Sequence, residues 1–141
     1  MIRIVTAAAA LLLSAAPALA QTADNKVVLT FETGARTGLV MVALYDSAAA
    51  FDGGSASPVA ATAISASGPV VATFENLPAG DYAVKAFHDV NGDGQMNTNP
   101  FGMPTEPYAF SNNAVGNMGP ARWDRAHFAV SGETTQSINI R

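Results

Sequence analysis

The stretch LPAGDYAVKAFHD, residues 77–89, decides the fold class of this chain. It begins as a turn, because proline fixes its own φ angle and the glycine and aspartate that follow tolerate tight turns. Side chains then alternate from Tyr82 to Phe87 with the period of a β-strand that has two distinct faces. A strand that ends in FENL, turns through PAG and resumes with a tyrosine is common in β-sandwiches. The stretch therefore predicts a strand of a sandwich.

The same two-residue period recurs on both sides of this stretch. The further predicted strands are residues 26–33, 39–46, 59–66, 70–77, 125–132 and 134–141. Residues 39–46, LVMVALYD, are apolar on both faces, which predicts a central strand. One helical turn is predicted at residues 48–51, inside a loop of small and polar residues. Seven strands separated by turn residues predict an all-β fold, an antiparallel sandwich.

Residues 1–20, MIRIVTAAAALLLSAAPALA, have the features of a secretory signal peptide. Arg3 precedes an apolar run that is too short to cross a bilayer, and Ala-Leu-Ala at residues 18–20 is a small-x-small cleavage site. The alternative is an uncleaved membrane anchor. We therefore expect an exported protein, periplasmic or extracellular after cleavage near Ala20, with a single sandwich domain over residues 21–141.

The composition excludes several classes of partner. The chain has a formal net charge of −4 and no basic patch, so nucleic acid and anionic membranes are poor partners. It has no cysteine, so an exported domain must be held together by its core or by a bound ion. No membrane span is expected in the mature chain. The partners that fit are an unidentified protein or a small-molecule ligand.

Residues 89–123 break the rhythm of strands, with only a short strand-like piece at residues 108–110. A structureless segment of this length in a compact domain is usually functional, disordered or wrongly assigned. Large apolar residues argue against disorder, and they are Met96, Phe101, Met103, Tyr108, Phe110, Met118 and Trp123. We therefore predict one long ordered loop that packs on the sandwich.

The start of this loop, HDVNGDGQMN at residues 88–97, resembles a calcium-binding loop. The pattern D-x-[DN]-x-[DN]-G places oxygen-bearing side chains at alternate positions of a curled backbone, where they can converge on one ion. The twelfth position of a helix-loop-helix site is Pro100 here, so a more distant carboxylate would have to contribute. The candidate calcium ligands are Asp89, Asn91, Asp93, Gln95, Asn97 and Glu106. The alternative is an ordinary turn, in which the same side chains bond to nearby backbone amides.

A second set of residues is interpreted as bracing the loop. His88 lies at a strand end, where it is either a hydrogen-bonding anchor, which we favour, or a ligand or general base. Residues 111–114, SNNA, lack a G-x-S-x-G elbow and are typical of a turn in which asparagine adopts positive φ or bonds to the backbone. The predicted bracing residues are His88, Tyr108, Ser111, Asn112, Asn113 and Trp123. No catalytic residue is predicted, and two histidines without cysteine make a structural zinc site a poor interpretation.

Residues 87–128, FHDVNGDGQMNTNPFGMPTEPYAFSNNAVGNMGPARWDRAHF, resemble the signature of the DUF2141 family of uncharacterised exported bacterial proteins. Three positions depart from the family pattern, because Asn97 replaces an aspartate, Ala109 a glycine and Ala121 a second proline. The first departure removes one charge from any ion site. The resemblance implies an exported immunoglobulin- or transthyretin-like β-sandwich, and it implies no activity.

Three functions follow from these features. The first, which we favour, is an exported non-enzymatic binding or structural module whose recognition surface is the loop at residues 89–123, with calcium as the candidate ordering ion. The second is a small exported hydrolase that uses His88 with Asp89 or Glu106. The third is a carbohydrate-binding sandwich, in which an exposed Tyr108 or Trp123 stacks on a sugar ring.

Overall fold

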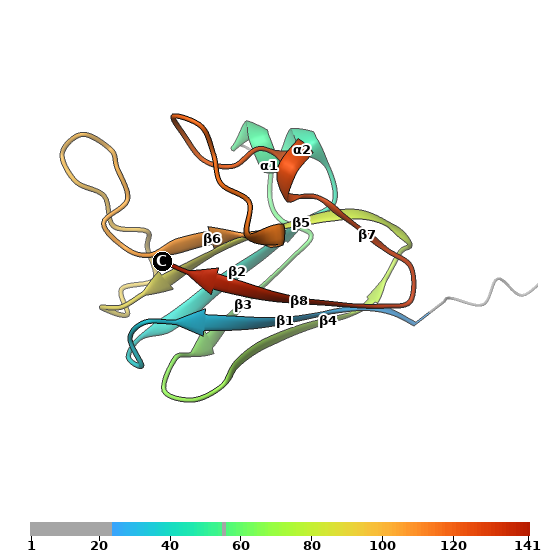
Figure 1. Ribbon diagram of the computed structural model, residues 1–141, viewed down its shortest axis with the longest axis horizontal. Helices are drawn as coiled ribbons and strands as arrows, with labels where there is room; N and C mark the ends of the chain where they lie inside the picture. Colours follow the sequence, from blue (N-terminus) through green and yellow to red (C-terminus); the bar gives the residue numbers. More distant parts are fainter. Residues whose placement is uncertain (1–23, 55) are drawn as a thin grey trace, which may run out of the picture.

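A computed structural model describes residues 24–54 and 56–141 of the chain (Figure 1). The predicted signal peptide at residues 1–20 lies outside these described residues. In the described part, two β-sheets pack face to face, and two short helices and two long loops stand on the outer side of one sheet (Figure 1). The first loop is residues 90–107 and the second is residues 114–122, so the single long loop predicted at residues 89–123 is divided in two. The prediction of an all-β sandwich is confirmed.

Within the described residues, the smaller sheet has three strands in the order β4 (Val70–Leu77), β1 (Asn25–Thr33) and β8 (Glu133–Ile140). Over the same residues, the larger sheet has five strands, β3 (Ala60–Ser65), β2 (Leu39–Tyr45), β5 (Gly80–Asp89), β6 (Tyr108–Phe110) and β7 (Phe128–Val130). The helices are α1 (Ala48–Gly53) and α2 (Trp123–Ala126), and a 3-10 turn spans Ser111–Asn113. The helical turn predicted at residues 48–51 is therefore present, as part of α1.

One strand pair differs from the predicted antiparallel arrangement. β1 and β8 lie side by side and run parallel, whereas the other strand pairs of the described residues are antiparallel. The two-residue period predicts a strand and its buried face, but it carries no information about the direction of a neighbouring strand. The short piece expected at residues 108–110 forms β6, which adds one strand to the seven predicted. The strand predicted at residues 125–132 is shorter than expected, because residues 125 and 126 belong to α2 and β7 spans Phe128–Val130.

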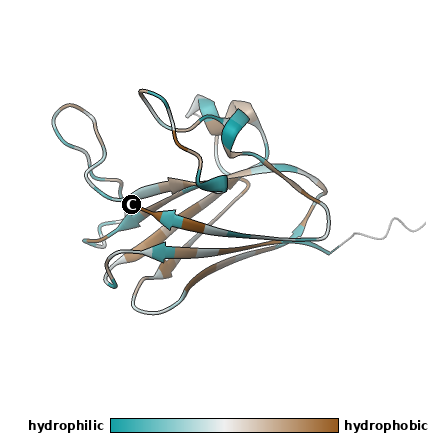
Figure 2. Cartoon of the chain, in the orientation of Figure 1, coloured by the Kyte–Doolittle hydropathy of each residue, from teal (hydrophilic) through white to brown (hydrophobic). Residues whose placement is uncertain are grey.

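The hydrophobic core lies between the two sheets and follows the predicted period. The inward side chains of β1, β2 and β5 are almost fully buried. They are Val27, Leu29, Phe31, Val40, Val42, Leu44, Tyr82, Val84 and Ala86. Figure 2 shows apolar residues along the strands of both sheets. Burial of each valine, leucine or phenylalanine contributes roughly 1.5–3 kcal/mol, so this layer is a large source of stabilisation.

One edge of β5 is shared by two short strands, which shapes the region beside it. β7 pairs with the first residues of β5, and β6 pairs with its second half. Between them, the backbone N–H of Val84 donates to the hydroxyl of Ser111 at 2.8 Å, and this hydroxyl donates to the carbonyl of Ala126 at 2.6 Å. The serine hydroxyl therefore takes the place of a backbone acceptor in the gap between β6 and β7, and it links β5 to the last residue of α2.

Candidate functional site

Asp89 ends β5, and its carboxylate organises the turn that follows. The side chain is fully buried. Its Oδ1 accepts from the backbone N–H groups of Gly92 at 2.7 Å and Asp93 at 3.2 Å, and its Oδ2 accepts from that of Gly94 at 2.7 Å. Both glycines have positive φ, which glycine adopts without strain. The carboxylate thus satisfies three backbone amides of one tight turn.

Glu106 binds the same loop from its other end. Its side chain is buried, and Oε1 accepts from the backbone N–H of Val90 at 3.0 Å. Its Oε2 accepts from the backbone N–H of Asn97 at 3.1 Å. Hydrogen bonds from amides to carboxylates are stronger than those between neutral groups, so Glu106 fixes the loop at two points.

The remaining candidate calcium ligands bond to one another. Asn91 Nδ2 donates to Asp93 Oδ2 at 3.1 Å and to Asn97 Oδ1 at 3.0 Å, and Asn97 Nδ2 donates to Asp93 Oδ2 at 2.9 Å. The backbone N–H of Gln95 donates to Asp93 Oδ1 at 2.9 Å. The bond from Asn97, followed by that from Gln95, holds the pKa of the Asp93 carboxyl below its usual range.

These contacts form a turn that is closed by its own hydrogen bonds. The structure brings Asp89, Asn91, Asp93 and Asn97 into this turn, and Glu106 bonds to its two ends. In residues 24–54 and 56–141, no group of three or more His, Cys, Asp or Glu side chains is arranged to hold a metal ion. A calcium ion would have to compete with the amide donors already in place. The contacts therefore favour the alternative prediction of an ordinary turn, and the calcium site stays a prediction that thermal unfolding with and without calcium tests.

His88 points into the sandwich and is almost fully buried. Its Nε2 lies 2.6 Å from the carbonyl oxygen of Thr37, so this nitrogen carries the hydrogen, and its backbone N–H donates to the carbonyl of Pro107 at 2.8 Å. His88, Asp89 and Glu106 do not line the groove over the larger sheet or the smaller pocket beside β6. Instead of gathering at a cleft, these three side chains connect backbone segments.

Asn112 and Asn113 join the larger sheet to β8. Both residues have positive φ. The backbone N–H of Asn112 donates to Gln136 Oε1 at 2.8 Å, and Gln136 Nε2 donates to Asn112 Oδ1 at 3.0 Å. Asn113 accepts from the backbone N–H of Asn139 at 2.8 Å and donates to the carbonyl of Ser137 at 3.0 Å. The Asn113 side chain therefore takes the place of a neighbouring strand along part of β8.

An aromatic cluster covers one end of the outer face of the larger sheet. Phe51 of α1 lies at its centre and packs edge to face against Phe110 and Trp123, with ring centroids 6.1 and 6.0 Å apart. Trp123 is half-buried and stacks on His127 with ring centroids 5.6 Å apart. Tyr108 lies beside the cluster and remains 42 % exposed. Trp123 is therefore a packing residue with one stacked face, and Tyr108 is the more open ring.

The long loop does not pack all its apolar residues on the sandwich, and the prediction was wrong in this respect. Phe110 is buried, but Phe101, Met103 and Met118 are 90 %, 63 % and 103 % exposed. The tip at residues 99–103 is closed within itself, because the Asn99 carboxamide accepts from the backbone N–H groups of Phe101 and Met103. A loop tip whose backbone groups bond to one another needs no contact with the sheet, so the side chains of Phe101 and Met103 remain exposed to solvent.

A groove of about 1200 Å³ lies over the outer face of the larger sheet, between the two loops. Strand pairing arranges its floor in two rows across the sheet. The first row is Ala61, Ala43, Lys85 and Phe110, and the second is Ala63, Met41, Phe87 and Tyr108. The walls come from residues 96–104 of the first loop and 118–120 of the second. Alanines on β2 and β3 leave the space that larger side chains would fill.

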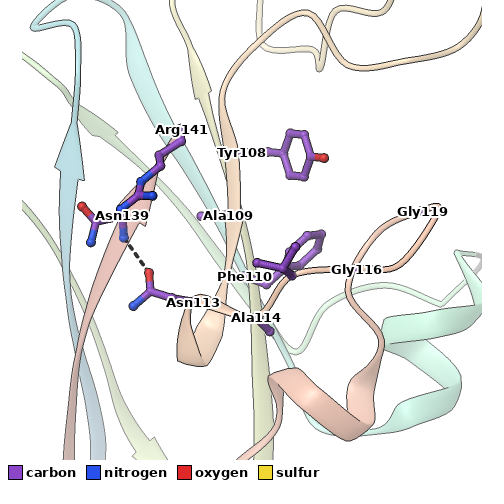
Figure 3. Close-up of a pocket in the computed structure, with 10 residues that line it drawn as sticks. Tyr108, Ala109, Phe110, Asn113, Ala114, Gly116, Gly119, Asn139 and Arg141 are labelled. Carbon is purple, nitrogen blue, oxygen red and sulfur yellow. Dashed lines mark hydrogen bonds between the residues drawn. The ribbon is translucent and has the colours of Figure 1, made fainter.

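A smaller pocket of about 460 Å³ lies beside β6 (Figure 3). Tyr108 and Phe110 point to one side of this strand, and Asn139 and Arg141 lie on the other, where the hydrogen bond from Asn139 to Asn113 is drawn (Figure 3). The pocket is more polar than the groove. The hydrogen bond between Asn113 and Asn139 lies in one wall of the pocket. The shape of the pocket therefore depends on the contact that joins residues 111–113 to β8.

Neither the groove nor the position of Lys85 in it was predicted from the sequence. The sequence did contain a signal for the groove, because strand 39–46 is apolar on both faces. The face that does not line the core must either be covered by other residues or form a binding surface. Ala61 and Ala63, on the neighbouring strand, are exposed. The aromatic cluster covers only one end of this face, and the open remainder is the groove.

The fold and the site define an all-β sandwich with a loop-walled groove on one sheet. The family model described as "Uncharacterized protein conserved in bacteria (DUF2141)" matches residues 31–139, and the chain belongs to this family. The predicted resemblance is confirmed. No curated protein and no solved structure gives a match to the chain. None of the helices in residues 24–54 and 56–141 has the length and apolar character needed to cross a membrane.

Proposed function

We propose that this protein is an exported, non-enzymatic binding module that takes an apolar small molecule in the groove of its larger sheet. The observation that carries the proposal is the groove itself, an open apolar hollow with Met103 and Met118 exposed at its walls. Small-molecule sites are concave, mostly apolar and typically about 300–1,000 Å³ in volume. Apolar patches that stay exposed on a soluble domain mark interaction sites. Export follows from the predicted signal peptide at residues 1–20.

The walls of the groove suit a ligand of adaptable shape. Met96 and Met103 come from the first loop, and Met118 comes from the second. Methionine is unbranched and polarisable, and it fills irregular spaces around different partners. The buried carboxylates of Asp89 and Glu106 fix the first loop at its base, so its methionines are held above the floor. The loop predicted as the recognition surface would then serve as the walls of the site.

The contacts favour this function over the two alternatives. A hydrolase would need His88 and a carboxylate at a cleft, whereas their polar atoms bond to backbone groups away from both hollows. A sugar site needs several hydrogen-bonding groups around an aromatic ring. Tyr108 is open enough to stack, but the groove around it is lined mainly by alanine, methionine and aromatic residues. An apolar ligand fits that lining better.

Titration with a neutral, environment-sensitive dye such as Nile red tests the proposal. We expect the mature folded protein to enhance the dye's fluorescence, and Ala63→Trp to weaken binding at least tenfold, because an indole would occupy the exposed floor. Thr73→Trp is the matched control, since Thr73 is exposed on the edge strand β4 of the other sheet. Absence of dye binding by the wild type, or equal binding by the two variants, would contradict the proposal.

A further inference from the structure

Lys85 is the one charged residue among the described residues that line the groove. It lies on the outer face of β5, in a row with Ala43 on β2 and Phe110 on β6. A lysine on an exposed sheet face normally extends into water. Here the side chain is only half-exposed, and it lies where the open floor of the groove meets the aromatic cluster.

The ammonium of Lys85 has apolar surroundings and little to bond to. Its Nζ donates to the backbone carbonyl of Phe51 at 2.5 Å, and it lies 4.7 Å from the centroid of the Phe51 ring and 5.0 Å from that of Tyr45. Ring faces attract cations, but they accept no conventional hydrogen bond. An ammonium has three N–H donors, so two directions are left for another partner.

No carboxylate of the described residues pairs with Lys85. The ion pairs in that part of the chain are Lys26 with Glu133 and Arg122 with Asp52. Asp52 also accepts from the backbone N–H of Trp123 at 3.0 Å, so its two oxygens are both engaged elsewhere. Half-burying a cation with no carboxylate in contact costs free energy, which the more distant charge of Asp52 offsets only in part. A ligand that carried an anion to the ammonium would recover part of this cost.

We infer that the groove binds a long-chain carboxylate, with its carboxylate on the Lys85 ammonium and its alkyl chain on the apolar floor. The inference rests on the proposed function and specifies the ligand class. A single lysine matches a head group with one negative charge. A phosphate monoester would call for further cations or an arginine fork, and the lining has neither.

The floor gives the alkyl chain a direction. On the Phe110 side of Lys85 the groove is closed by the aromatic cluster. On the other side, Ala43 and Ala61 form a shallow path from β5 to β3, a distance of roughly 10 Å over two strand spacings. Ala61 is exposed, so this path is open at the edge of the sheet. The head group would therefore lie at the closed end and the chain would run towards the open end.

The test compares hexadecanoate with hexadecan-1-ol, which has the same chain and no charge, in displacement of the neutral dye at pH 7.5. We expect the wild type to bind hexadecanoate at least tenfold more tightly than the alcohol. Lys85→Met should lose at least tenfold in affinity for hexadecanoate and bind the alcohol as before, and Lys85→Arg should recover part of the loss. Lys26→Met is the matched control, because it removes the other lysine, which lies on β1 of the smaller sheet.

The outcomes separate this inference from the proposed function. If the wild type bound neither the dye nor either ligand, both would fail. If the dye and the alcohol bound but hexadecanoate gained nothing from Lys85, the inference alone would be overturned. A second measurement avoids variants altogether, through NMR of the wild type with its lysines ¹³C-dimethylated, which keeps their charge. Hexadecanoate should shift the Lys85 signal and leave the Lys26 signal in place, and an unmoved Lys85 signal would also overturn the inference.

Discussion

The two faces of the larger sheet use neighbouring residues of the same strands in opposite ways. Leu44 and Val84 point inward and are fully buried against the smaller sheet, whereas Ala43 and Lys85, next to them in sequence, face the groove. Inward positions are filled by side chains large enough to leave little space. Outward positions hold alanines, Met41, Lys85 and aromatic residues, and the alanines leave part of this face uncovered. The difference indicates that the inner face maintains the fold and the outer face is available for binding.

The largest expected effect is on the inner face. Leu44→Ala should lower the free energy of unfolding by about 2–5 kcal/mol, because it leaves a cavity in a closed core. Met41→Ala, on the outer face of the same strand, should cost only about 1 kcal/mol, because Met41 is half-exposed and faces the groove. Urea unfolding followed by Trp123 fluorescence measures both. Equal losses would remove the distinction between the two faces.

The next effect is at the end of β5, where the strand becomes the loop. Asp89→Ala should lower stability by about 2 kcal/mol or more, because three backbone amides lose a buried charged acceptor. Asp93→Ala is the control and should cost less, since Asp93 is exposed and water can replace its bonds. Limited proteolysis within residues 90–107 should likewise accelerate more in the first variant. The opposite ranking would show that the exposed cluster, and not Asp89, holds the loop.

Calcium gives a sharper version of this test. We expect the thermal midpoint of the wild type to be the same in EDTA and in millimolar calcium, because the buried carboxylates already accept from backbone amides. An ion that bound only the folded state at a hundredfold excess over its Kd would add about 2.7 kcal/mol, which is several degrees for a domain of this size. A calcium-specific rise of that order, lost in Asp93→Ala, would establish the turn as an ion site.

The sequence predicted the inner face well, because burial on one side of a strand imposes a period that can be read directly. It also predicted a self-bonded turn at residues 89–97 as an alternative, since aspartate and glycine at this spacing suit backbone capping. The groove was not predictable in this way. It depends on Ala43, Ala61 and Lys85 meeting in one row, and that row is set by strand order and register. A lysine alternating with apolar residues reads as an ordinary exposed position until its neighbours across the sheet are known.

The parallel pairing of β1 with β8 was missed for a related reason. These strands are at opposite ends of the described chain, and their contact depends on the path taken by all the strands between them. The exposed methionines were mispredicted because apolar residues in a loop were assumed to seek cover. Turns closed by Asn99 and by the Asp89 carboxylate fix the first loop without that cover. Local hydrogen bonding, more than hydrophobicity, determines where that loop stands.

The smallest expected effect compares one titratable residue from each face at alkaline pH. Burial raises the pKa of Tyr82, on the inner face, with a smaller contribution from the charge of Asp46. Burial lowers the pKa of Lys85, on the outer face, and the charge of Asp52 opposes this shift. In both cases burial disfavours the charged form. The consequences for stability are opposite, because the neutral form of tyrosine holds its proton and the neutral form of lysine has lost it.

Between the lowered pKa of Lys85 and 10.5, the unfolded chain keeps a proton that the folded protein has released, so Lys85 makes stability rise with pH in that window. Above pH 10 the folded protein keeps the Tyr82 proton that the unfolded chain releases, so Tyr82 makes stability fall.

Urea unfolding of the wild type and of Lys85→Met from pH 8 to 11 isolates the contribution of Lys85, since that of Tyr82 is common to both proteins. The wild type should gain stability relative to the variant as the pH rises through the window. If the plots of stability against pH for the two proteins stayed parallel, the Lys85 ammonium would be as well solvated in the folded protein as in the unfolded chain. The outer face would then lack the apolar surroundings that distinguish it from an ordinary exposed sheet.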